Sequence, residues 1–431
     1  MSSVDTHQLA AAAPTARYPW ILVGLLWLVA FLNSADRTIL IAVMPQIRTQ
    51  FGLTQTQLAV ISSTFFWIYA VAAFFSGRLG DRVPRSRVIL YGLAFWSVAT
   101  GVASLATGVV MLIALRGLVA LGESTYFPAA TALISDWHEP RMRSRTLSLH
   151  QTAVFAGAGL GALIAGMIAD RVGWRIPYLV YGAAGIALCF VLRRWLRDAP
   201  TRSAASIVRE EQEGTDLKAK RDPLGIVLRN PSALFLCVVF FLATGASTGV
   251  SVWSPTFVHD TLGLNLGESA LYGSTTINIA GFLAVPLGGL LADALTARTS
   301  IGRFHALTIG LSIAAVCLLP LRLADSALTV GFVLLASSIG KGLFDGCIYA
   351  SMHDVVPPEA RATAVGLMTM LGFFGGGITP IFVAEAAGRY GMGVGITSLA
   401  ALYVAAVALL LATRNLTRQA VSQTRELEAP R

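Results

Sequence analysis

Long apolar stretches alternate with short polar stretches along nearly the whole chain. A helix needs about 20 residues to cross the hydrocarbon core of a bilayer, and twelve apolar stretches meet or approach that length. Lipid offers the backbone no hydrogen-bond partners, so we expect each stretch to be a helix and not an open strand. The predicted spans cover residues 20–44, 58–79, 88–106, 109–134, 146–169, 175–192, 232–256, 268–293, 304–322, 328–351, 362–385 and 391–413.

The composition supports this pattern and excludes a soluble protein. Hydrophobic residues make up 55% of the 431-residue chain and charged residues only 13%. Too few polar side chains are therefore available to cover a surface that faces water. The sequence predicts an all-α polytopic membrane protein.

The net charge of +9 is explained by topology, so no nucleic-acid partner is expected. If the N-terminus lies inside, most Lys and Arg residues fall in the inner loops and tails, as the positive-inside rule requires. We therefore expect both termini in the cytoplasm, and the absence of a targeting segment favours a bacterial inner membrane. The residues expected in the outer loops are Arg48, Arg171, Arg175, Arg322 and Arg389.

One polar connector, residues 193–231, divides the predicted spans into two sets of six that repeat one another weakly. Residues 77–82 (GRLGDR) match 289–294 (GLLADA) at three positions, and 136–143 (DWHEPRMR) share Asp, Pro and Arg with 354–361 (DVVPPEAR). Repeated six-helix halves are typical of transporters that bind substrate near the membrane centre, between the halves. The predicted organisation is a cytoplasmic tail (1–19), an N-terminal bundle (20–192), a cytoplasmic linker (193–231), a C-terminal bundle (232–413) and a second cytoplasmic tail (414–431).

Four ionisable side chains lie inside the first and fourth predicted spans. Asp36 and Arg37 interrupt the first span, where each charge costs roughly 2.5–3.5 kcal/mol in hydrocarbon. As neighbours they leave the helix about 100° apart, so each needs a partner on another helix. Arg116 and Glu123 lie nearly two turns apart on one face of the fourth span. We expect these two acids and two bases to form one network.

The tenth span carries Lys341 and Asp345, whose i,i+4 spacing allows them to pair along one helix face. By the offset between the halves, Lys341 occupies the position that corresponds to Glu123. We therefore expect an acid from one half and a base from the other to face a shared, water-reachable cavity. Protonating Glu123 or Asp36 would release an arginine, which can hold a carboxylate or phosphate through two hydrogen bonds.

The segment GRLGDRVPRSRVI (77–89) resembles the loop between the second and third helices of the major facilitator superfamily. The match consists of a glycine, a leucine two residues on, an aspartate and a basic cluster. With twelve spans in two halves, the resemblance extends to the whole chain. It implies the major facilitator fold, transport by alternating access, and an electrostatic latch. The latch residues are Gly77, Asp81, Arg82 and Arg85, with Asp293 in the repeat of the second half.

Within that superfamily, the first half resembles the Spinster-like group in the Asp–Arg pair, in LAFWS (93–97) and in RGLVALGESTYFPAATALISD (116–136). Parts of the same region, together with GWR (173–175), also look like the organic-anion:cation symporters, so both groups stay open. The first resemblance implies a lysolipid-like amphiphile, which requires an apolar lining and a side opening toward lipid. The second implies a sugar acid or small carboxylate, which requires a closed polar pocket.

The resulting hypothesis is a proton-coupled secondary transporter of an organic anion or an anionic-headed amphiphile, acting as a monomer among membrane lipids. We expect Asp36 and Glu123 to carry the coupling proton, and His150 to sit at the membrane interface. The predicted substrate contacts are Arg37, Arg116, Lys341, Asp345, Asn33 and Tyr126.

Other function classes lack support in the sequence. The four cysteines show no metal-ligand spacing, and no phosphate-binding Gly-rich loop or nucleophile motif occurs. We therefore expect no metal, no cofactor and no enzymatic activity. A non-transporting membrane sensor is the least favoured alternative, because it should carry a sizeable additional soluble domain.

Overall fold

The structure, a computed structural model, describes residues 17–138, 140–199, 223–357 and 360–428. Within these ranges it leaves out the side chains of residues 74–82, 140–141, 143–145, 148, 362 and 423–428. Twelve helical stretches in the described part are long and apolar enough to cross a membrane. Each overlaps one of the twelve predicted spans, which confirms the all-α polytopic fold.

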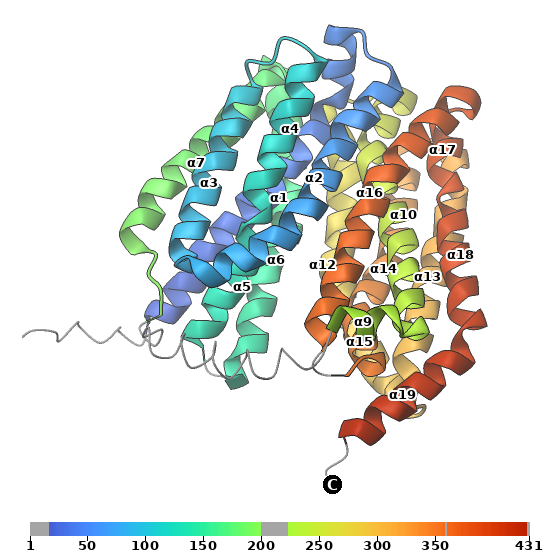
Figure 1. The fold of residues 1–431 in the computed structure, drawn as a ribbon. Helices are drawn as coiled ribbons and strands as arrows, with labels where there is room; N and C mark the ends of the chain where they lie inside the picture. Colours follow the sequence, from blue (N-terminus) through green and yellow to red (C-terminus); the bar gives the residue numbers. More distant parts are fainter. Residues whose placement is uncertain (1–16, 139, 200–222, 358–359, 429–431) are drawn as a thin grey trace, which may run out of the picture.

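The N-terminal half forms one bundle of helices (Figure 1). Its fourth span is interrupted near the middle, because Thr125 separates α4 from α5. The helices are α1 (Tyr18–Phe51), α2 (Gln55–Arg82), α3 (Arg85–Ala103), α4 (Val109–Ser124), α5 (Tyr126–Trp137), α6 (Pro140–Val172) and α7 (Arg175–Trp195).

The C-terminal half forms a second bundle beside the first, and its tenth span is also interrupted, between α14 and α15 (Figure 1). A short helix, α9 (Pro223–Leu228), precedes the C-terminal bundle. A further helix, α19 (Arg414–Glu428), follows the last span and lies within the segment expected to be a tail. The remaining elements are α10 (Pro231–Leu262), α11 (Leu266–Ala270), η1 (Leu271–Thr275), α12 (Thr276–Thr296), α13 (Gly302–Leu318), η2 (Leu319–Leu323), α14 (Ala327–Asp345), α15 (Ile348–Val355), α16 (Arg361–Tyr390), α17 (Met392–Ser398) and α18 (Ala400–Ala412).

Glycines allow α1 and α6 to pack backbone against backbone in the N-terminal half. A Cβ added at Gly157 would lie 2.2 Å from the Phe31 carbonyl oxygen, and one at Gly161 would lie 2.6 Å from the Ala35 Cα. Lipid tails are as apolar as leucine, so helices in a membrane associate through this kind of close packing. The contact fixes the rotation of α1, and thereby the directions in which its central polar residues point.

The two ends of the bundle differ in how the halves meet. We call the end at which α7 stops and α10 begins the linker end, and the opposite end the far end. At the far end, the Arg48 guanidinium of α1 donates to both carboxylate oxygens of Asp260 of α10, at 2.6 and 2.8 Å. Thr56 of α2 donates to Glu385 of α16 at 2.8 Å. These bonds close the far end across the two halves.

A third bridge at the far end joins α6 to α11. The Asp170 carboxylate accepts the backbone N–H groups of Leu266 and Gly267 at 2.9 and 2.8 Å. At the linker end, by contrast, the ion pairs between described residues stay within one half: Arg85 with Asp136, and Arg303 with Asp354.

Candidate functional site

Arg37 is the centre of a buried polar cluster in the N-terminal half. It lies in the middle of the 34-residue helix α1, and its Nε donates to Glu123 Oε2 of α4 at 2.6 Å. One turn earlier on α1, the Asn33 side-chain oxygen accepts from Arg37 Nη2 at 2.8 Å. The Glu123 side chain is fully buried, whereas 26% of the Arg37 side chain is exposed. The pair therefore combines an enclosed acid with a partly accessible base.

Aromatic rings place Arg37 at the seam between the two halves. Its guanidinium carbon lies 4.6 Å from the ring centre of Tyr69 and 5.3 Å from that of Phe65, both on α2. Such cation–π contacts stabilise a charge that has left water. The Tyr69 ring in turn stacks on Phe373 of α16, with ring centres 4.6 Å apart. Tyr69 therefore contacts both Arg37 and α16. If α16 moves relative to α2, the Tyr69 ring transmits that movement to Arg37.

Asp36 faces a different part of the same half. Its Oδ2 accepts from the Thr100 hydroxyl of α3 at 3.3 Å, and its Oδ1 has no hydrogen-bond partner among the described residues. Arg116 is buried, with its guanidinium 4.7 Å from the Phe65 ring centre, and its Nε is likewise unpartnered. The expected four-charge network is thus one direct ion pair, Arg37–Glu123, flanked by two buried charges without an ion pair in the described structure.

The C-terminal half carries a second, separate ion pair. Lys341 Nζ lies 2.6 and 2.7 Å from the two carboxylate oxygens of Asp345, as their spacing predicted. The pair lines a cavity of about 150 Å³ to which α6 of the other half contributes Phe155. Hydroxyl and amide groups make up most of the remaining polar lining, from Ser247, Ser251, Ser337, Ser338, Asn278 and Tyr403. Among the described residues, no hydrogen bond or ion pair joins Lys341 to the Arg37 cluster.

An apolar groove of about 260 Å³ adjoins this cavity between α6 and α12. The two hollows share Phe155 and Asn278. The other residues that line the groove are Ala156, Gly159, Leu160, Thr275, Ile279, Phe282 and Leu283. Four of these have large side chains that are 46–56% exposed: Leu160, Ile279, Phe282 and Leu283.

Tyr126 and His150 lie away from both hollows. Tyr126 is only 1% exposed, and its hydroxyl contacts the Leu26 carbonyl oxygen at 2.5 Å and His150 Nε2 at 2.7 Å. A substrate contact for Tyr126 stays a prediction that this placement does not favour. The His150 side chain is fully buried within the protein and contacts the Tyr126 hydroxyl, and its place at the membrane interface stays a prediction.

The latch residues are only partly described. The side chains of Gly77, Asp81 and Arg82 lie outside the described part of α2. Arg85, at the start of α3, forms an ion pair with Asp136 of α5, and Asp293, near the end of α12, is exposed. The latch therefore stays a prediction.

The sequence profile of the Major Facilitator Superfamily matches residues 26–380. The chain belongs to this superfamily. The resemblance inferred from the motif at 77–89 is thereby confirmed, and the curated relatives of the chain are transporters and not enzymes.

Two of the similar proteins are named as transporters of sugar acids. The chain is 25% identical over 402 residues to the probable galactarate/D-glucarate transporter GudP of Escherichia coli, which covers 87% of this chain and 88% of the relative. It is 24% identical to the hexuronate transporter of Bacillus subtilis, covering 85% and 88%. A crystal structure of a bacterial homologue of the human lysosomal transporter Spinster, inward-facing and occupied, has a TM-score of 0.75 at 22% identity over 95% of this chain and 97% of that one. At this identity, the likeness concerns the fold alone.

Proposed function

We propose that this protein is a secondary transporter that moves an organic anion across the bacterial inner membrane by alternating access, driven by protons. The observation that carries the proposal is the Arg37–Glu123 ion pair, whose acid is fully buried and which lies near the middle of α1, beside the seam between the halves. Buried ion pairs stabilise a fold weakly at best. A charge pair in this place is therefore better explained by transport than by packing.

Glu123 carries the coupling proton in this proposal. Its Oε1 has no hydrogen-bond partner among the described residues, so it can receive a proton without first breaking a bond. Protonation removes the charge that holds Arg37 and frees the guanidinium. Because arginine stays charged and presents a planar fork of donors, the freed group binds a carboxylate or phosphate through two bonds.

Asp36 is the second proton-carrying group in the proposal, and Arg116 its basic neighbour. Among the described residues, Asp36 accepts a hydrogen bond from Thr100 alone, and a carboxylate that is buried with one free oxygen is costly in its charged form. Proton exchange at Asp36 is therefore expected to respond to helix movements that open or close its surroundings between α1 and α3.

Lys341 and Asp345 supply the substrate contacts of the C-terminal half. The lysine neutralises an anionic head in the cavity of about 150 Å³, while the surrounding serines and Asn278 offer hydrogen bonds to its hydroxyl groups. Substrate that contacts Lys341 on one side and Phe155 on the other touches both halves, which is what an alternating-access transporter requires.

The substrate head is an anion, and two substrate classes fit different parts of the structure. The polar cavity and the sugar-acid transporters among the relatives favour a sugar acid. The second candidate, a lysolipid-like amphiphile, is favoured by the adjoining groove between α6 and α12, whose mostly apolar lining suits an acyl chain.

The orientation of the chain follows from its charges. We propose that the linker end faces the cytoplasm, because described basic residues gather there, among them Arg193, Arg194 and Arg229. With the far end bridged by Arg48–Asp260 and Asp170–Leu266, the structure then represents a state open to the inside, and the latch at Asp81 acts when that side closes.

Purified protein in liposomes with an imposed pH gradient tests the proposal. Uptake of labelled glucarate and of labelled lysophosphatidylglycerol should be measured with and without the gradient, and against liposomes that lack protein. Proton-driven accumulation of either compound supports transport of its class. Uptake of neither compound, or uptake that ignores the gradient, contradicts the proposal.

A further inference from the structure

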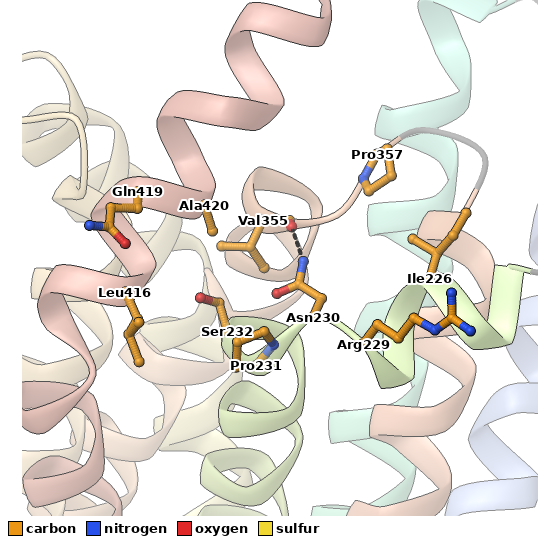
Figure 2. A pocket seen from close by; sticks show the side chains of 10 residues that line it. All are labelled: Ile226, Arg229, Asn230, Pro231, Ser232, Val355, Pro357, Leu416, Gln419 and Ala420. Atoms are coloured by element: carbon orange, nitrogen blue, oxygen red, sulfur yellow. Dashed lines mark hydrogen bonds between the residues drawn. The ribbon is translucent and has the colours of Figure 1, made fainter.

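A pocket of about 450 Å³ opens at the linker end of the C-terminal half, far from the two ion pairs described above. Four segments enclose it: the end of α9, the first turn of α10, the end of α15 with the residues that follow it, and α19 (Figure 2). Its lining residues are Ile226, Arg229, Asn230, Pro231, Ser232, Val355, Pro357, Leu416, Gln419 and Ala420.

The pocket floor is the N-terminus of a 32-residue helix, α10, with its cap already built. Asn230 accepts the Ala233 N–H through its side-chain oxygen at 3.2 Å and donates its amide to the Val355 carbonyl oxygen at 2.7 Å. Pro231 has no N–H to offer. The N–H of Ser232 is consequently the donor of this helix terminus that stays free for an acceptor in the pocket.

The Ser232 hydroxyl is a second free donor at the same place. Ser232 is 3% exposed, lines the pocket, and makes no hydrogen bond to another described residue. Figure 2 shows its oxygen directed into the space beneath α19. The residue is otherwise enclosed, so its hydroxyl presents a donor to an acceptor that binds in the pocket.

The charges around the pocket favour an anion. None of the ten lining residues is acidic. Figure 2 shows Gln419 on the α19 side of Ser232, and Arg229 at the opposite rim, directed toward Ile226. Arg229 forms no ion pair with a described residue. The positive end of the α10 dipole adds to this potential, and helix N-termini with free N–H groups are a common phosphate site in proteins.

We propose that this pocket binds a phosphate group through the N–H and hydroxyl of Ser232, with the charge of Arg229 and the amide of Gln419 at the rim of the pocket. The group belongs either to an anionic phospholipid headgroup or to a soluble phosphate compound. Its volume exceeds that of one phosphate, and Ile226, Val355 and Leu416 provide apolar contacts for the rest of the ligand. An occupant joins α9, α10 and α19, so its binding stabilises the C-terminal half.

The test is thermal unfolding of the purified full-length protein in detergent, with three added probes: inorganic phosphate, dihexanoyl phosphatidylglycerol, and dihexanoylglycerol, which lacks the phosphate. We expect a phosphate-bearing probe to raise the melting temperature and the phosphate-free probe to leave it unchanged. A shift with inorganic phosphate assigns the site to soluble phosphates, whereas a shift with phosphatidylglycerol alone assigns it to lipid.

Two exposed positions and a matched control sharpen the assignment. The variants Arg229→Glu and Gln419→Glu introduce a negative charge at the pocket and should weaken the apparent affinity at least about tenfold. Arg418→Glu makes the same charge reversal on α19 at an exposed residue that does not line the pocket, and should bind as the unmodified protein does. The proposal is overturned if no phosphate-bearing probe stabilises the unmodified protein, or if Arg418→Glu weakens binding as much as Arg229→Glu.

Discussion

The two ion pairs of the proposed transport site are built in opposite ways. Arg37 and Glu123 come from different helices and are 86 residues apart in sequence, and the acid is fully buried. Lys341 and Asp345 lie one turn apart on a single helix, and 37% of the Asp345 side chain is exposed. Only the first pair couples the position of one helix to the charge state of another.

This difference suggests a division of work between the halves. Breaking the Arg37–Glu123 pair alters a protonation site and also a contact between two helices. Breaking the Lys341–Asp345 pair alters only charges on one helix that line the cavity. We therefore expect the N-terminal pair to control proton coupling and the C-terminal pair to control substrate affinity. Four substitutions test this separation.

The largest effect is expected from Glu123→Gln. The amide keeps the shape of the side chain but cannot exchange a proton, and removing one partner of a buried pair costs roughly 3–5 kcal/mol. Proton-driven transport in liposomes should fall at least about 100-fold, while the protein still inserts and purifies as a folded species. An unchanged dependence of transport on pH would remove Glu123 from the coupling mechanism.

Arg37→Lys should have the next largest effect, although it keeps the positive charge. A lysine cannot reproduce the fork that reaches Glu123 and Asn33 together, so transport should fall by about 10–100-fold. Arg48→Lys is the matched control, because Arg48 also makes a two-pronged bond, but to a partly exposed partner. That control should change transport only a few-fold at most, and equal losses in the two variants would contradict the special role of Arg37.

Lys341→Gln should act on affinity more than on rate. It removes the cation from the cavity, so the KM for an anionic substrate should rise about tenfold with a smaller change in kcat. Lys341→Arg keeps the charge and should recover most of the affinity. A fall in kcat at unchanged KM would place Lys341 with the coupling groups and would break the proposed division between the halves.

Thr100→Val is expected to have the smallest effect. It removes the one hydrogen bond that Asp36 accepts from a described residue, a weak bond at 3.3 Å, and should cost about 0.5–1.5 kcal/mol of stability. Thermal unfolding measures this loss, and Thr38→Val on α1, which removes a hydroxyl bonded only to its own helix, serves as the control. If Thr100→Val reduced transport as much as Glu123→Gln does, Asp36 would be as important for transport as Glu123.

The sequence predicted the spans and the local pair well, because both depend on spacing along one helix. Twelve apolar stretches define twelve helices, and the i,i+4 register of Lys341 and Asp345 already brings them together. The helix α19 was expected only to be a tail, since a short amphipathic segment carries a much weaker signal than a span.

Contacts between helices were predicted only in outline. Burial of four charges in the first and fourth spans indicated a network, but the rotation of α1, fixed by its packing on Gly157 and Gly161, decides that Arg37 and not Asp36 meets its oppositely charged partner. Phe155 and Phe373 could not be singled out from the sequence, because aromatic residues in a membrane protein usually pack or lie at the interface.

The most direct test of the central claim is infrared difference spectroscopy of the purified protein as the pH is lowered. If Glu123 accepts the coupling proton, a carbonyl band of a protonated carboxylic acid appears in the unmodified protein. The account predicts that this band is smaller in Glu123→Gln, where Asp36 still contributes, and that Asp345→Asn keeps the Glu123 contribution. A band that persists unchanged in Glu123→Gln would contradict it.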